Sequence, residues 1–165
     1  MSETEILKAA TLDNTAYHSL EGQRKLCKVV SVYDGDTVTV ALVVKETPEL
    51  FKCRVSGVDT PEMRPPRAME SRETHIAAAI RARNRVAQLL TNCPVDLLEQ
   101  TKKLDLKENT KLLDVECGAF DKYGRLLVNF PIGETSLSLT LIGEEYAQPY
   151  DGGTKHNWNF HRLQD

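Results

Sequence analysis

The chain is poor in the features that mark several classes of protein. Aromatic residues make up 6% of its 165 residues, and the net charge is only −3. A single-strand-binding module uses exposed aromatic residues and a basic groove, and a protein that mainly coats phosphate backbones is usually basic. No apolar run approaches the roughly 18 residues of a membrane-spanning helix. The composition therefore disfavours a pure nucleic-acid-coating protein and a membrane partner.

Cysteine is scarce, and its spacing is unlike that of a metal site. No Cys-x-x-Cys pair occurs and no histidine lies nearby at zinc-finger spacing, which argues against structural zinc. The acidic segment 1–5 lacks the basic and apolar regions of a secretory signal. We therefore expect an intracellular protein with reduced thiols, and a phage or a virus is the suggested origin. The cysteines are Cys27, Cys53, Cys93 and Cys117.

The hydrophobic pattern divides the chain into three parts. Residues 1–24 show no strong periodicity and are expected to form an N-terminal extension. Residues 25–160 carry regular patterns and form the domain, and residues 161–165 are a short tail. A chain of this length can bury about 70% of its unfolded surface, so a self-sufficient core is feasible.

Runs of β-branched residues predict strands, and one apolar stripe predicts a long helix. Ser71 is expected to cap that helix, whose buried stripe includes Ile76 and Ile80 and ends near Asn92; Ser138 is expected to cap a short second helix. A meander, a helix and further strands predict an α+β fold, a small OB-type Greek-key barrel with packed helices. The expected strands are Leu26–Tyr33, Val38–Val44, Phe51–Val55, Val95–Glu99, Leu112–Cys117 and Leu126–Phe130, with a loop at Lys45–Leu50.

Three short segments place acids and arginines beside strand ends. They are Asp34–Thr37, Arg54–Glu62 and Asp121–Arg125. Each one alone is explained as an exposed turn, because Asp-Gly is a routine hairpin turn and Asp-Thr-Pro-Glu can begin a helix. The combination of the three is far more specific than any one of them.

Together the segments contain every group that phosphodiester hydrolysis needs. The reaction requires a cation, an oriented water and positive charge against the transition state. Asp36 and Asp59 offer hard oxygen ligands for Ca²⁺ or Mg²⁺, and Glu62 can hold or deprotonate the attacking water. Arg54 and Arg125 offer planar, bidentate donors to phosphate. These five residues predict a metal-dependent phosphodiesterase.

The three segments, in this order, resemble those of the staphylococcal nuclease family. The resemblance spans roughly Lys25 to Trp158, and the five-residue step from Arg54 to Asp59 matches the family's motif. It implies a five-stranded OB-type Greek-key barrel with packed helices. It also implies cleavage of the 5′-side P–O bond of DNA and RNA, which leaves 3′-phosphates. We expect a monomer with nucleic acid as its substrate.

The resemblance also implies a metal site. Asp36, Asp59 and the backbone carbonyl of Thr60 would bind Ca²⁺, with Mg²⁺ or Mn²⁺ as alternatives. Asp34 would support the ion from behind these ligands.

The same resemblance assigns the catalytic and substrate-binding groups. Glu62 would be the general base, and Arg54 and Arg125 would hold the scissile phosphate. Lys122 and Tyr123 would contact the other phosphate of a bound nucleotide end.

Several further residues have alternative interpretations. Tyr150 could stack on a base or pack against the barrel, and Tyr33 is expected in the core. Arg64 and Arg67 are expected beside the site. The histidines do not cluster in sequence, and surface or helix-face positions are expected for His18, His75, His156 and His161.

The main alternative function is a nuclease-like module that binds nucleic acid or protein without cutting, as in the tandem repeats of Tudor-containing regulators. Such a module is expected to have lost acids or arginines, because a buried carboxylate cluster without a metal is electrostatically costly. All five residues remain here. This favours the enzyme over the binding module.

Overall fold

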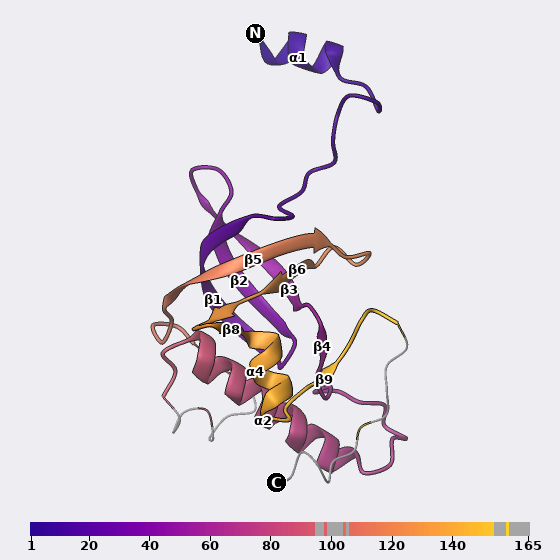
Figure 1. Ribbon diagram of the computed structural model, residues 1–165, viewed down its shortest axis with the longest axis vertical. Coiled ribbons are helices and arrows are strands. Elements are labelled where there is room, and N and C mark those ends of the chain that lie inside the picture. The colour runs from indigo at the N-terminus through magenta and orange to yellow at the C-terminus, as the bar shows by residue number, and fades with distance from the viewer. Residues whose placement is uncertain (95–97, 99–103, 105, 154–157, 159–165) are drawn as a thin grey trace.

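A closed barrel of five strands forms the centre of the molecule (Figure 1). The computed structural model describes residues 1–94, 98, 104, 106–153 and 158. Around the barrel the strands follow the order β1-β2-β3-β6-β5. Neighbours are antiparallel except for the parallel pair β3 and β6. The α+β arrangement agrees with the prediction and is consistent with an OB-type barrel. The bounds are Arg24–Asp34 for β1, Thr37–Val43 for β2, Pro48–Val55 for β3, Leu112–Phe120 for β5 and Leu126–Asn129 for β6.

Strand β1 contains a bulge that decides which side chains face the barrel interior. Cys27 and Val29 point inward, and the register with β2 then shifts between Val29 and Ser31. An extra residue at a bulge moves the in–out alternation by one position. Val32 and Asp34 are therefore buried, and Tyr33 is half exposed. The expectation that Tyr33 belongs to the core is wrong for this reason.

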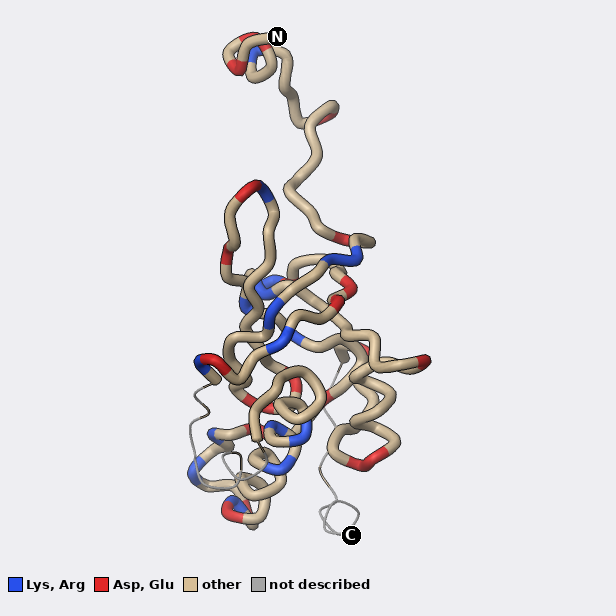
Figure 2. Tube along the Cα trace, turned by 90° about the vertical axis from the view of Figure 1, so that its left-hand side faces the viewer, with Lys and Arg blue, Asp and Glu red and all other residues tan. Residues whose placement is uncertain are grey.

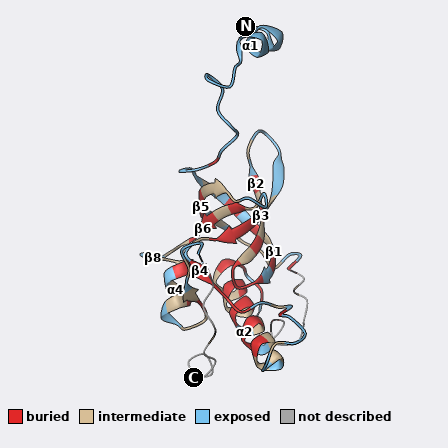
Figure 3. Ribbon diagram, turned by 90° about the vertical axis from the view of Figure 1, so that its right-hand side faces the viewer, coloured by how far each residue is buried: buried red, intermediate tan, exposed pale blue. Residues whose placement is uncertain are grey.

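Helix α2, Arg72–Leu90, lies below the barrel in Figure 1 and contacts β1. Its most buried face differs in part from the expected stripe, because His75 and Arg83 are buried while Ile76 and Ile80 are only half buried. Figure 3 shows this buried side of the helix turned toward the barrel. Ser71 precedes α2 but adopts a left-handed conformation, φ 57°, and its side chain makes no capping bond. The predicted cap is therefore wrong.

Helix α4, Leu137–Gly143, begins two residues earlier than its predicted cap implies. Ser136 is the capping residue, and its side chain accepts a hydrogen bond from the N–H of Leu139. Ser138 is instead buried, where its hydroxyl donates to the carbonyl of Ser56 and accepts from the amide of Asn129. A buried serine that bonds two other segments holds elements together, so it is not available as a cap.

Short two-stranded ladders complete the described structure. Strand β4, Val58–Asp59, pairs with β9, Gln148–Pro149, and places residues after 149 beside the end of β3. Strands β7, Pro131–Ile132, and β8, Thr135–Ser136, form a small hairpin.

The expected start of one strand is wrong, and another expected strand lies largely beyond the described residues. Strand β3 begins at Pro48 within the expected loop, and the first residue of a strand is a position that tolerates proline. The expected strand Val95–Glu99 lies outside the described residues apart from Leu98, which is buried in a helical turn. The expected tail, residues 161–165, also lies outside them.

Residues 1–19 project from the barrel as an exposed extension (Figure 2). They include a short helix that the sequence pattern did not predict, α1, Glu3–Ala9, which begins with a capping box between Ser2 and Glu5. No helix in the described ranges has the length and apolar character needed to cross a membrane.

All four cysteines are buried and free, as the sequence predicted for reduced thiols. Burial raises the pKa of the Cys27 and Cys53 thiols to about 12. These side chains therefore act as small apolar core residues and not as nucleophiles.

Candidate active site

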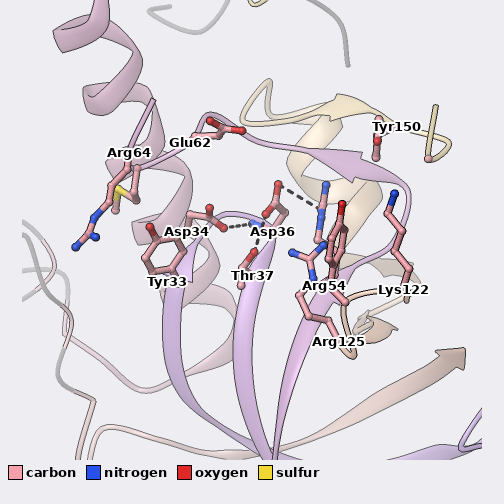
Figure 4. A pocket seen from close by; sticks show the side chains of 13 residues that line it. Tyr33, Asp34, Asp36, Thr37, Arg54, Glu62, Arg64, Lys122, Arg125 and Tyr150 are labelled. Carbon is pink, nitrogen blue, oxygen red and sulfur yellow. Dashed lines mark hydrogen bonds and ion pairs between the residues drawn. The ribbon is translucent and has the colours of Figure 1, made fainter. Parts of the chain in front are cut away.

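The three acidic and basic segments meet at one end of the barrel, around an open cleft of about 560 Å³. Pairing of β2 with β3 places Thr37 opposite Arg54, and the parallel pairing of β3 with β6 places Arg54 opposite Leu127. The turn that precedes β6 is thereby brought beside the β1–β2 turn. Figure 4 shows the side chains around this space, among them Asp34, Asp36, Arg54, Glu62, Lys122 and Arg125.

The β1–β2 turn is held in place by its own acids. The carboxylate of Asp34 accepts a hydrogen bond from the N–H of Asp36 at 3.1 Å. The carboxylate of Asp36 accepts from the hydroxyl of Thr37 at 2.9 Å and from the N–H of Thr60 at 3.1 Å. Asp36 therefore joins the first segment to the second.

Gly35 lets this turn approach the second segment and α2 closely. A Cβ at this position would lie 2.7 Å from Cγ2 of Thr60 and 2.9 Å from Cβ of Ala82. Both distances are far below the usual 3.5–4.0 Å between carbon atoms. Only glycine fits without a shift of the turn.

The guanidinium of Arg54 is buried and oriented by the backbone. Its Nη1 donates to the carbonyls of Val55 and Val58, at 3.0 and 2.9 Å. The same group lies 3.3 Å from Oδ2 of Asp36, and Nη2 lies 3.8 Å from Oδ1 of Asp59. Arg54 thus lies between two carboxylates with its plane set by two carbonyls.

Asp59 and Thr60 lie deeper than the other predicted site residues. Their exposed fractions are 3% and 1%, and neither lines the cleft. The hydroxyl oxygen of Thr60 is buried without a hydrogen-bond partner in the part of the chain that the structure describes. The two residues form the wall behind Asp36 and Arg54.

The carboxylates suit a hard divalent cation by their chemistry. Asp34, Asp36 and Asp59 are all buried, and Asp36 and Asp59 lie 3.3 and 3.8 Å from the guanidinium of Arg54. Burial and the charge of Asp36 raise the pKa of Asp34 to about 8. A cation beside these oxygens would offset that repulsion.

Side chains alone do not complete a coordination sphere. Within the described ranges, no group of three or more His, Cys, Asp or Glu side chains is arranged to hold a metal. Calcium takes six to eight oxygen ligands and accepts carbonyls and waters among them. The residues present fit such an ion if backbone oxygens and water supply the remaining ligands.

Glu62 lies at the edge of the cleft with an exposed side chain, and its backbone is tied to helix α2. Its N–H donates to Nε2 of His75 at 2.8 Å. His75 lies on helix α2, as one of the two expected positions has it, but it is only 2% exposed, so the surface alternative is wrong. Burial lowers the pKa of His75, although the charges of Glu62 and Asp59 act in the opposite direction. The three- and four-residue steps from His75 to Ala78 and Ala79 were the available signal of burial.

The third segment is a turn organised by Asp121, to which sequence analysis assigned no role. Its Oδ1 accepts from the N–H groups of Tyr123 and Arg125, both at 2.9 Å, and its Oδ2 accepts from Nε of Arg125 at 2.8 Å. Burial opposes ionisation of Asp121, but these bonds hold its pKa below the usual value. Gly124 takes the left-handed conformation of the turn, φ +82°. Asp121 therefore sets the orientation of Arg125.

Basic and aromatic side chains form one rim of the cleft. The ring of Tyr123 lies 5.1 Å from the ammonium of Lys122 and 5.5 Å from the guanidinium of Arg125. Arg64 also lines the cleft, as expected, whereas exposed Arg67 is not part of its lining.

Two further tyrosines line the cleft. Tyr150 packs over the guanidinium of Arg54 at 5.7 Å, and its hydroxyl donates to the carbonyl of Gly153 at 2.8 Å. Tyr33 lies on the opposite side, near Asp34 (Figure 4). Tyr150 is therefore both packed against the protein and open to the cleft.

Among the residues that the structure describes, the other histidine, His18, does not line the cleft. His18 lies against Phe120, with ring centroids 6.0 Å apart. His156 and His161 lie outside the described residues.

A comparison of the chain with protein-family models found no matching family, and a comparison with curated proteins found no match. Any function assigned to the cleft therefore rests on its own geometry and chemistry.

Proposed function

We propose that this protein is a metal-dependent nuclease that hydrolyses phosphodiester bonds in DNA, RNA or both. The observation that carries the proposal is the meeting of three distant segments, with their acids and arginines, around one open cleft. We include in the proposal that the barrel is the Greek-key, staphylococcal-nuclease-like form of the OB type. Cleavage would then occur at the 5′-side P–O bond and leave 3′-phosphates.

The buried carboxylates would hold the metal. Asp36, Asp59 and the carbonyl of Thr60 are the proposed ligands of Ca²⁺, with Mg²⁺ or Mn²⁺ as alternatives. Asp34 fixes the backbone of Asp36 through its 3.1 Å hydrogen bond. When bound, such an ion neutralises a non-bridging phosphate oxygen and so favours attack at phosphorus.

Glu62 is the proposed general base. Its exposed carboxylate lies at the edge of the cleft, where water has access to it. It would orient the attacking water and accept its proton.

The two arginines would bind the phosphate and stabilise the charge that grows on it in the transition state. Two carbonyls orient Arg54, and Asp121 orients Arg125. A guanidinium that the protein already holds in place loses little further conformational freedom when it binds phosphate. Lys122 and Tyr123 lie on the rim beside Arg125, and in this proposal they would contact a neighbouring phosphate.

The decisive experiment is a matrix of substrates and metals. Purified protein is incubated with plasmid, denatured DNA or RNA, in EDTA or in millimolar Ca²⁺, Mg²⁺ or Mn²⁺, and the product ends are analysed. We expect cleavage only with a divalent ion and 3′-phosphate ends. If all substrates stay intact under all conditions, the enzyme is rejected; binding without cleavage would support the non-catalytic module instead.

Matched variants assign the activity to the cleft. Glu62→Gln should slow cleavage by about 10²-fold or more, the usual scale for loss of a general base. Glu134→Gln makes the same chemical change at an exposed position in the β7–β8 turn, away from the cleft, and should leave the rate unchanged. Equal rates for Glu62→Gln and the parent protein would remove Glu62 from its proposed role.

A further inference from the structure

The hydrogen bond from the backbone N–H of Glu62 to Nε2 of His75 links the cleft to the main helix. The two residues are 13 positions apart. Glu62 lies in the loop that connects β4 to α2, and His75 lies in α2 itself. Pro61, Pro65 and Pro66 lie in or beside this loop, and proline has no N–H donor. The loop therefore has fewer backbone N–H donors with which to fix its own shape.

His75 is a buried residue near the start of helix α2. Helix α2 packs its alanine, valine and leucine side chains into the protein, and the imidazole is 2% exposed. A ring so deeply buried does not reach a substrate in the cleft. Any effect of His75 on the chemistry must therefore act through its neighbours, and Glu62 is the neighbour that lines the cleft.

The bond constrains the chemical state of the ring. Nε2 accepts a hydrogen bond only when it carries a lone pair, so the imidazole is neutral with its proton on Nδ1. Burial, which lowers the pKa of His75, favours that neutral form. The hydrogen-bond geometry and the burial of the ring thus both favour Nε2 as the acceptor.

We propose that His75 is a positioning residue, which fixes the backbone of Glu62 on helix α2 and so places the Glu62 carboxylate at the cleft. This inference rests on the proposed function, because it concerns the residue that would be the general base. A displacement of about 1 Å at a catalytic group is enough to lower turnover by roughly 10²-fold. One buried acceptor thus controls how well Glu62 is aligned.

The first test removes and restores the acceptor. His75→Leu keeps a side chain of similar size without an acceptor, and we expect kcat to fall by roughly 10- to 100-fold with KM nearly unchanged. His75→Gln carries an oxygen near the position of Nε2 and should recover most of the lost rate. His75→Asn is too short to reach the N–H and should stay impaired. Equal rates for the Gln and Asn variants would overturn the inference, even if the Leu variant fails to fold.

A control separates positioning from loss of stability. Val86→Ala removes buried volume from the same helix, in the hydrophobic core. At a temperature where every variant is folded, by circular dichroism, Val86→Ala should retain the parent kcat. A similar loss of kcat in Val86→Ala and His75→Leu would show that helix packing alone is responsible, and would overturn the inference.

A double-mutant cycle identifies the residue through which His75 acts. If the effect passes through the Glu62 carboxylate, His75→Leu should change the residual rate of Glu62→Gln very little, because the base is already lost. The same fold-loss in both backgrounds contradicts the inference. Failure of the proposed function would be seen earlier, as an inactive parent protein. Failure of this inference alone would leave an active parent, an impaired Glu62→Gln and an unimpaired His75→Leu.

Discussion

The close approach of Gly35 to Thr60 and Ala82 makes Gly35→Ala a sharp test of how the cleft is assembled. The added methyl would lie 2.7 Å from Cγ2 of Thr60 and 2.9 Å from Cβ of Ala82. Carbon atoms normally pack at about 3.5–4.0 Å, so the overlap is close to 1 Å on two sides. Thr60 belongs to the wall of the site and Ala82 to helix α2, so the turn itself is expected to move.

Two effects of different size follow from this overlap. Overpacking of a tight site costs about 1–3 kcal/mol of unfolding free energy, and for a domain of this size each kcal/mol lowers Tm by about 2–4 °C. The shift of the turn also strains the 3.1 Å bond between Asp36 and the N–H of Thr60. A misplacement of this order lowers turnover by up to about 10²-fold. We therefore expect a modest loss of stability and a larger loss of activity.

The assay compares urea unfolding, followed by far-UV circular dichroism, with the cleavage rate at a temperature where the protein is folded. Gly143→Ala is the matched control, because a Cβ there meets no atom within 4 Å and the residue ends helix α4. It should raise stability by up to about 1 kcal/mol and leave the rate unchanged. In the Gly35→Ala background, Thr60→Ser removes the closest contact and should recover part of both losses.

A Gly35→Ala variant with parent stability and parent rate would refute this reasoning. It would mean that the β1–β2 turn is not pressed against Thr60 and α2 in solution. The close packing at Gly35 would then not be what holds Asp36 against the N–H of Thr60.

Further perturbations address the charged groups. Asp121→Asn should weaken the hold on Nε of Arg125 and slow turnover by roughly tenfold, since one charged hydrogen-bond partner is lost; an unchanged kcat would show that Arg125 is oriented without it. Arg54→Lys keeps the charge but has a single nitrogen, so it cannot both bind the two carbonyls and place a second donor beside Asp59 or a phosphate. Steady-state kinetics should therefore show a loss of about 10²-fold, and a fully active variant would contradict the role of Arg54. The pKa of Asp34 is raised from 3.8 to about 8, so the folded protein keeps a proton that the unfolded chain releases. In EDTA, stability should therefore fall as pH rises through that window. Asp34→Asn should flatten this slope in urea midpoints measured between pH 5 and pH 8, and added Ca²⁺ should stabilise the parent more at pH 8 than at pH 5; the same slope in both proteins would contradict the assignment.

Local patterns predicted much of the framework. The β-branched runs around Asp34–Asp36 predicted the first hairpin, because strand propensity and Asp-Gly turn chemistry both depend on neighbouring residues. The five candidate catalytic residues, in three segments, could be recognised in the sequence because the chemistry of a side chain does not depend on the fold. The prediction failed where packing overrides the local pattern. The bulge in β1 exposes Tyr33, and hydrogen bonds to Ser56 and Asn129 take Ser138 away from the cap position.

The meeting of the three segments depends on tertiary structure. Parallel pairing of β3 with β6 brings the Asp121–Arg125 turn to Arg54, and the β4–β9 ladder brings Tyr150 over the same guanidinium. The contact of His75 with Glu62 likewise requires α2 to pack below the barrel. The available side chains, and most of the strands that carry them, thus follow from local sequence patterns. Their distances and burial depend on the closed barrel, because pairings between remote strands follow from the packing of the whole core and not from neighbouring residues.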